Sequence, residues 1–155
     1  MKLLFLDFDG VLNSHDYFRA NRSALQRDQL DEAAGARVQR LCETVGAKIV
    51  VSSTWRLNRS LTDLRVVLSR VGVDPTLVID KTPDFMRSEA RGLEIQEWLD
   101  LNGAGCSGMC IVDDDSDMHH LMPWLVQTTF AHGLTDETVE AAIRTFQTPP
   151  PGRAP

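Results

Sequence analysis

The opening segment constrains the fold of this chain more than any other stretch. A short apolar run, residues 3–6, leads into Asp7 and Asp9, and Gly10 follows directly. A continuous apolar run bounded by glycine is typical of a strand buried on both faces of a parallel sheet. In open α/β sheets, ligands gather beyond the carboxyl ends of such strands. The two aspartates are therefore placed where a functional site is expected.

The spacing of these two aspartates indicates a shared site. Side chains two residues apart on a strand face the same way, so Asp7 and Asp9 converge if the strand conformation persists. Two crowded carboxylates need a cation, or one of them must hold a proton. Gly10 allows the chain to turn sharply beside them. Ordinary strand-end aspartates that begin a turn are the alternative interpretation.

The remainder of the chain alternates between short apolar strands and amphipathic helices. Strands are expected over residues 47–51, 76–79, 109–112 and 124–128. Helices are expected over residues 32–45, 61–71 and 91–101, and over a last segment, 136–146, that Thr135 caps. This alternation predicts a three-layer, Rossmann-like α/β fold, with a parallel sheet between two layers of helices.

Size and charge limit the architecture and the partners. With 155 residues, we expect one domain over residues 1–147, followed by a proline-rich, disordered tail over residues 148–155. The formal net charge of −6 argues against broad electrostatic capture of nucleic acid, although it allows a local basic groove.

Other features of the sequence predict where the protein is located in the cell. The sequence shows neither a signal-like segment nor an apolar run long enough to span a membrane. Its three cysteines are an odd number without a zinc-ligand pattern. We therefore expect a cytoplasmic, reduced protein without a membrane partner. The sequence does not indicate the oligomeric state.

Hydroxyl side chains end the strand at residues 47–51. Ser52 and Ser53 follow it, and a hydroxyl at a strand tip can bind a phosphoryl oxygen. Ser52 is favoured because it is the first polar residue, and Ser53 is the alternative. Arg56 lies close by in the sequence and can pair with a phosphate through two hydrogen bonds. A surface arginine at a helix start is the other interpretation of Arg56.

Acidic side chains follow the strand at residues 109–112. Asp113, Asp114, Asp115 and Asp117 fall within five positions and would repel one another without a counter-ion. Asp117 is a candidate outer-shell acid or helix cap. A solvated acidic turn is the alternative interpretation of this segment.

In this order the segments resemble the motifs of the haloacid dehalogenase (HAD) superfamily of phosphotransferases. Those motifs are D-x-D-G after a strand, a Ser or Thr at a strand tip, a basic residue near a helix start, and paired acids after a strand. The resemblance implies that Arg91 is the basic residue, with Lys81 and Arg87 as alternatives, and that it shares the phosphoryl charge with Ser52. The expected substrate-binding residues are Gly10, Ser53 and Arg56.

The resemblance also implies catalytic roles and a cofactor. Asp7 is expected to attack phosphorus and form an aspartyl-phosphate, and Asp9 to act as general acid and then general base. Mg²⁺ is expected on Asp7, on the main-chain carbonyl of Asp9 and on Asp114, with Asp113 supporting the site. Mn²⁺ suits the same oxygen ligands.

Three further strings narrow the resemblance. S-S-T-W-R, R-G-L-E-I-Q-E-W-L and V-D-D-D-S-D-M are similar to a capless HAD group of RNA-repair proteins, and distantly to the phosphatase domain of polynucleotide kinase-phosphatase. The polar segment 14–31 is too short for a cap domain, so the site is expected to be open to bulky substrates. This implies a phosphatase acting on polynucleotide 3′ or 5′ phosphate ends. A small-molecule nucleotidase and a non-catalytic partner module in a repair system are the alternatives.

Overall fold

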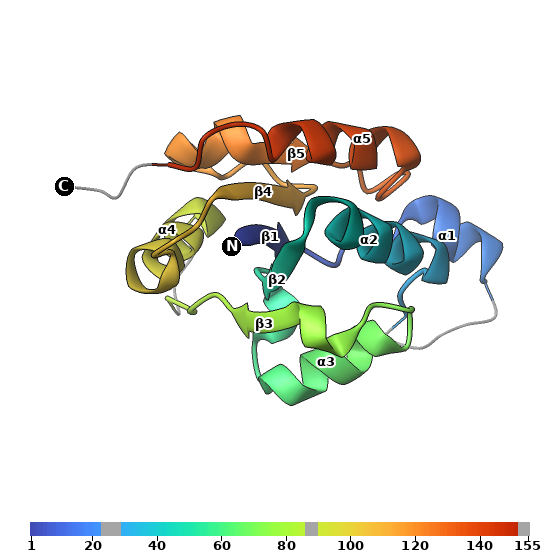
Figure 1. Cartoon of the computed structure of the whole chain (residues 1–155). Helices are drawn as coiled ribbons and strands as arrows, with labels where there is room; N and C mark the ends of the chain where they lie inside the picture. The colour runs from blue at the N-terminus through green and yellow to red at the C-terminus, as the bar shows by residue number, and fades with distance from the viewer. Residues whose placement is uncertain (23–28, 86–89, 152–155) are drawn as a thin grey trace.

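The computed structural model describes residues 1–22, 29–85 and 90–151. Its centre is a sheet of five parallel strands in the order β3-β2-β1-β4-β5 (Figure 1). The strands are β1 (Lys2–Leu6), β2 (Ala47–Val51), β3 (Val78–Lys81), β4 (Gly108–Asp113) and β5 (Leu125–Gln127). The predicted parallel α/β sheet is thereby confirmed.

Helices cover both faces of this sheet (Figure 1). The α-helices are α1 (His15–Ala20), α2 (Glu32–Val45), α3 (Leu61–Ser69), α4 (Arg91–Asn102) and α5 (Asp136–Thr145). Short 3₁₀ helices are η1 (Thr54–Arg56), η2 (Pro75–Leu77) and η3 (His119–Trp124). Buried side chains of α2, α3 and α5 form one core against the sheet, and those of α4 and η3 form a second core on the opposite face. The molecule therefore has the predicted three layers.

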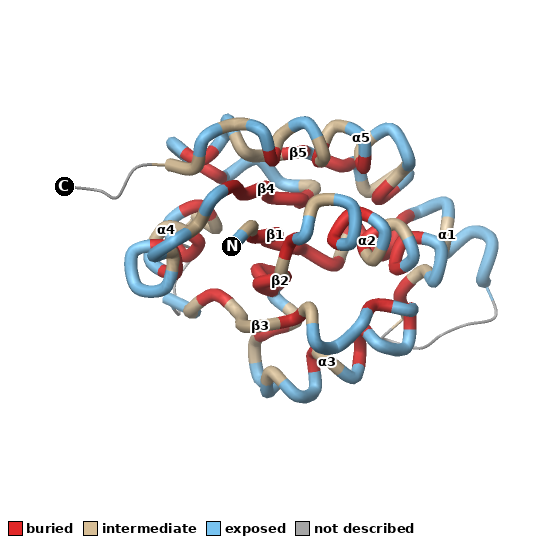
Figure 2. Tube along the Cα trace, in the orientation of Figure 1, coloured by how far each residue is buried: buried red, intermediate tan, exposed pale blue. Residues whose placement is uncertain are grey.

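Strand β1 lies between these two cores. Leu4 and Leu6 belong to the core under α2, whereas Leu3 and Phe5 belong to the core under α4. This division follows from the alternation of side chains along a strand. All four side chains are fully buried, and Figure 2 colours β1 as buried beyond its first residue. Burial on both faces explains why β1 reads as a continuous apolar run and why its carboxyl end is held firmly.

Two predicted strands are shifted or shortened in the structure. The strand expected at residues 76–79 begins at Val78, because the preceding residues form η2. Pro75 occupies the first turn of η2, and the Asp74 carboxylate accepts a hydrogen bond from the Thr76 amide at 2.8 Å. The strand expected at residues 124–128 covers only β5, because Trp124 ends η3.

Helix ends and faces also differ in detail from the predictions. Helix α2 has the predicted bounds, while α3 ends at Ser69, two residues before the predicted end. On α4, the apolar residues Leu93 and Leu101 are exposed. Gly92 and Glu94 are buried there instead. The spacing of apolar residues along α4 is therefore not enough to predict which face of the helix packs against the sheet.

The segment between β1 and α2 carries one short helix, α1, in its described part. The amides of His15 and Asp16 donate to the carbonyls of Phe130 and Ala131, at 2.8 and 3.1 Å. These bonds hold the start of α1 against the loop that follows β5. With this length, the segment has no room for a folded cap domain.

Part of the predicted tail is described. The Trp124 indole donates to the carbonyl of Pro149 at 2.9 Å. The proposed domain boundary at residue 147 and the disorder of residues 148–155 stay predictions. Within the described ranges, every helix is too short or too polar to cross a membrane.

Close packing of α2 gives a first test of this arrangement. A Cβ atom at Gly35 would lie 2.0 Å from the main-chain oxygen of Val71. We expect Gly35→Ala to lower the free energy of unfolding by about 1–3 kcal/mol, because helix and loop must separate. Chemical denaturation measures this, with Ala33→Ser at an exposed position of α2 as a control expected to stay within about 0.5 kcal/mol of wild type. An unchanged denaturation midpoint for Gly35→Ala would contradict the packing.

Candidate active site

Strand register brings polar side chains to one level at the carboxyl edge of the sheet. Leu6, the last paired residue of β1, lies opposite Val51 of β2 and Val112 of β4. The residues that follow these three are Asp7, Ser52 and Asp113, so they share the next level. Because side chains alternate along a strand, this level faces the same side as Leu3 and Phe5, which is the side that α4 covers.

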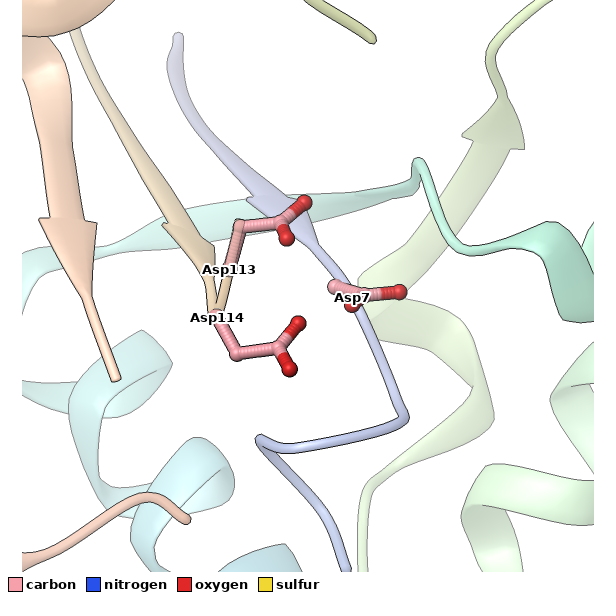
Figure 3. Close-up of side chains that lie close together, drawn as sticks. All are labelled: Asp7, Asp113 and Asp114. Atoms are coloured by element: carbon pink, nitrogen blue, oxygen red, sulfur yellow. The ribbon is translucent and has the colours of Figure 1, made fainter. Parts of the chain in front are cut away.

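Three carboxylates meet at this edge. Asp7, Asp113 and Asp114 each offer an oxygen atom, and these atoms lie within 4.8 Å of one another. Figure 3 shows Asp113 and Asp114 at the end of β4, with their side chains extending toward the segment that carries Asp7. Asp7 and Asp113 are buried, and Asp114 is half-buried. The cluster therefore concentrates negative charge in a place with little water to screen it.

Arg91 supplies positive charge to this cluster. It is the first residue of α4, and its Nη1 atom lies 2.9 Å from Oδ1 of Asp7 and 2.6 Å from Oδ2 of Asp113. The Arg91 amide, at the start of this helix, donates to the Asp117 carboxylate at 3.0 Å. One guanidinium faces three carboxylates, which leaves an excess of negative charge.

The pKa values of these groups reflect this imbalance. Burial, and then the charge of Asp7, raises the pKa of Asp113 to about 7, against the opposing effect of Arg91. Burial and Asp7 likewise raise the pKa of Asp114. Burial alone would lower the pKa of Arg91, but Asp7 and Asp113 outweigh it and raise that pKa. A cation at the cluster would relieve the repulsion that these shifts express.

The chemistry of the cluster fits a small divalent cation. Carboxylate oxygens are the ligands that Mg²⁺ prefers. Gly10 lies against Asp114, since a Cβ atom at this position would be 2.4 Å from Asp114 Oδ2, and its φ of +74° also favours glycine. The chain therefore leaves room for the Asp114 carboxylate beside the turn that follows Asp7. Asp7 and Asp114 are two of the residues predicted to hold the metal, and Asp113 lies beside them.

Asp9 is held by partners that the sequence interpretation missed. Its Oδ1 accepts a hydrogen bond from the Asn13 amide group at 2.8 Å, and its Oδ2 accepts one from the Trp55 indole at 2.9 Å. The sequence places Trp55 in the string S-S-T-W-R, but nothing in that string indicates a bond to Asp9. Both oxygen atoms of the Asp9 carboxylate are thus oriented by the protein.

The two candidate hydroxyls differ in their surroundings. Ser53 Oγ accepts a hydrogen bond from the Trp55 amide at 3.3 Å and caps η1. Ser52 Oγ is buried and has no hydrogen-bond partner, and the same holds for the Thr82 hydroxyl after β3. A buried hydroxyl without a partner costs about 1–3 kcal/mol, which a bound ligand oxygen can recover. This difference favours Ser52 over Ser53 as a phosphate-binding residue.

The structure corrects the expectation that Arg56 binds substrate phosphate. Its guanidinium is buried and donates to the carbonyls of Ser52, Ser53, Thr82 and Pro83, at 2.9–3.1 Å. It also donates to the Glu94 carboxylate at 2.5 Å. These five bonds use all five N–H groups of an arginine side chain, so none is left for a ligand. Arg56 instead ties the segment after β2 to the segment after β3 and to α4.

Of the two alternatives to Arg91, only Lys81 is described by the structure, and its amine is bonded elsewhere. Lys81 Nζ donates to the carbonyls of Arg56 and Arg59, at 3.2 and 2.7 Å. Arg87 falls outside the described residues. Of the two candidates that the structure describes, Arg91 is the one that contacts the carboxylate cluster.

These features define a class of protein. A parallel sheet in the order β3-β2-β1-β4-β5, with an aspartate after its central strand, a hydroxyl after β2 and paired aspartates at the end of β4, is a HAD-superfamily domain. The chain belongs to the family described as the HAD domain in Swiss Army Knife RNA repair proteins, whose model matches residues 3–139. This confirms the predicted resemblance. Comparisons with curated proteins and with solved structures found no match.

The carboxylate cluster gives a test by metal addition. We expect Mg²⁺ to raise the melting temperature of the wild-type protein, since a ligand at 100 times its Kd stabilises the folded state by about 2.7 kcal/mol. Asp114→Asn should melt higher than wild type without metal, because repulsion falls, and should lose most of the Mg²⁺ shift. Differential scanning calorimetry in chelator and in Mg²⁺ measures both effects.

A matched control comes from the next residue. The Asp115 side chain is exposed, and Asp115 is not part of the cluster of Asp7, Asp113 and Asp114. Asp115→Asn removes one nearby charge and should keep the Mg²⁺ shift. Equal shifts in Asp114→Asn and wild type would mean that the cluster does not bind the metal.

Proposed function

We propose that this chain is a Mg²⁺-dependent phosphomonoester hydrolase that acts through an aspartyl-phosphate on Asp7. One observation carries the proposal: a buried aspartate at the end of the central strand contacts a guanidinium and lies level with an unpartnered hydroxyl. These are a nucleophile, a cation for developing phosphoryl charge and a donor for a phosphoryl oxygen. Membership of a HAD family supports the same chemistry.

The first step forms a bond between an Asp7 oxygen and phosphorus while the bond from phosphorus to the leaving oxygen breaks. Ser52 donates to a phosphoryl oxygen, and Arg91, already 2.9 Å from Asp7, balances the negative charge of that region. Mg²⁺ held by Asp7, Asp114 and the main-chain carbonyl of Asp9 would neutralise further charge on the phosphoryl group. Asp113 keeps Arg91 in place through its 2.6 Å contact.

Asp9 acts as general acid in the first step and as general base in the second. It gives a proton to the leaving oxygen, and the product alcohol departs. It then takes a proton from the water that attacks phosphorus, and the Asp7 carboxylate is regenerated. Asp7 and Asp9 are both present in this chain, which argues against a non-catalytic partner module.

The proposed substrate is a phosphate at the 3′ or 5′ end of a polynucleotide. The family description refers to RNA repair proteins, and the segment between β1 and α2 is too short to form a cap over the site. The net charge of −6 favours the second candidate, a nucleotidase for small substrates. We place either activity in the reducing cytoplasm, which accords with three free cysteines.

Phosphate release tests the proposal. We expect wild-type protein with Mg²⁺ to release phosphate from 3′- or 5′-phosphorylated oligonucleotides more efficiently than from mononucleotides, and Asp7→Asn to lose the activity by at least about 10⁴-fold. Asp115→Asn serves as the matched control and should retain activity. Release of phosphate from mononucleotides alone would place the chain in the nucleotidase class. Near-normal activity of Asp7→Asn would disprove the proposal that Asp7 is the nucleophile.

A further inference from the structure

The indole of Trp55 holds the second carboxylate of the site. Its Nε1 atom lies 2.9 Å from Oδ2 of Asp9. We propose that Trp55 is a positioning residue that fixes the Asp9 carboxyl group for proton transfer to and from the scissile oxygen. This inference rests on the proposed function, and it adds a residue that acts through Asp9 without touching phosphorus.

The donor and the acceptor in each hydrogen bond around Asp9 can be assigned in only one way. The Gly10 amide donates to Asn13 Oδ1 at 2.9 Å, which identifies that atom as the oxygen of the side-chain amide. The nitrogen of the same amide then donates to Asp9 Oδ1. An indole N–H can only donate, so Trp55 must donate to Oδ2. Each carboxylate oxygen therefore has one fixed donor, and the plane of the carboxyl group is set.

Trp55 is itself held in place from several sides. Its ring packs edge-to-face against Phe8, with ring centroids 5.4 Å apart. The guanidinium of Arg59 lies over the ring, 5.0 Å from its centroid. Its main-chain amide donates to Ser53 Oγ. The indole can thus transmit a defined orientation to Asp9, because few other orientations are open to it.

This arrangement couples two parts of the reaction. Trp55 lies in η1, three residues after Ser52, so the segment after β2 carries both the phosphoryl-binding hydroxyl and the indole that orients Asp9. As the bond from Asp7 to phosphorus forms, the proton on Asp9 moves to the departing oxygen. Proton transfer of this kind contributes about 10²–10⁴-fold, and a misplaced group loses part of it.

The test compares two leaving groups. Trp55→Phe keeps the ring and removes only the N–H donor. We expect it to lower kcat/KM for a phosphorylated oligonucleotide or mononucleotide, whose alkoxide needs a proton, by about 10-fold or more. For p-nitrophenyl phosphate, whose phenolate leaves without one, we expect kcat/KM to stay within about 3-fold of wild type. In an Asp9→Asn background, Trp55→Phe should add no further loss with either substrate.

Trp98→Phe is the matched control. The Trp98 indole also donates to a carboxylate, Asp80 Oδ2, at 2.7 Å, but it does so from α4 and away from Asp9. This variant should lower stability without changing the ratio of the two kcat/KM values.

Each result decides the proposal. An equal loss on both substrates, or no loss on either, would overturn the positioning role of Trp55. If wild-type protein released phosphate from neither substrate, the proposed function itself would fail and the role of Trp55 would fall with it. Activity of wild type on both substrates separates these two failures.

Discussion

Repulsion among three carboxylates, only partly offset by one arginine, is the constraint that the rest of this structure must accommodate. Asp7, Asp113 and Asp114 lie together because the register of β1 and β4 leaves no alternative, and the two cores hold those strands. Arg91 offsets part of the charge through contacts of 2.9 and 2.6 Å. The apolar core thus contributes the free energy that keeps like charges together, and the remaining charge makes the site ready for a cation.

Helix α4 connects the parts of the site. Arg91 at its start reaches the carboxylate cluster, and Glu94 one turn later pairs with the buried guanidinium of Arg56. Arg56 in turn donates to the carbonyls of Ser52 and Ser53, next to the Ser52 hydroxyl that we propose binds phosphate. A shift of α4 would therefore move the Arg91 guanidinium and the Ser52 hydroxyl together. Such rigid support for reacting groups is what phosphoryl transfer requires, because positioning and charge supply most of its catalysis.

The sequence predicted the sheet, its layers and the carboxylate edge, because apolar strands that end in acidic or hydroxyl residues are strong local signals. It could not predict that Arg56 is buried, since three of its five acceptors, on Thr82, Pro83 and Glu94, come from distant segments and reach it only when β2, β3 and α4 meet. The bond from Trp55 to Asp9 was missed for the same reason, because the two residues are 46 positions apart in the sequence. The shift of β3 came from a proline turn that overrode its apolar residues.

The most direct measurement is detection of phosphate on Asp7. Protein mixed with a phosphorylated oligonucleotide and Mg²⁺, quenched in acid and digested, would be analysed by peptide mass spectrometry. We expect a phosphorylated peptide that contains Asp7, absent from Asp7→Asn, and more abundant in Asp9→Asn because hydrolysis of the intermediate lacks its base. Turnover in wild type with no phosphorylated peptide in wild type or in Asp9→Asn would contradict an aspartyl-phosphate mechanism.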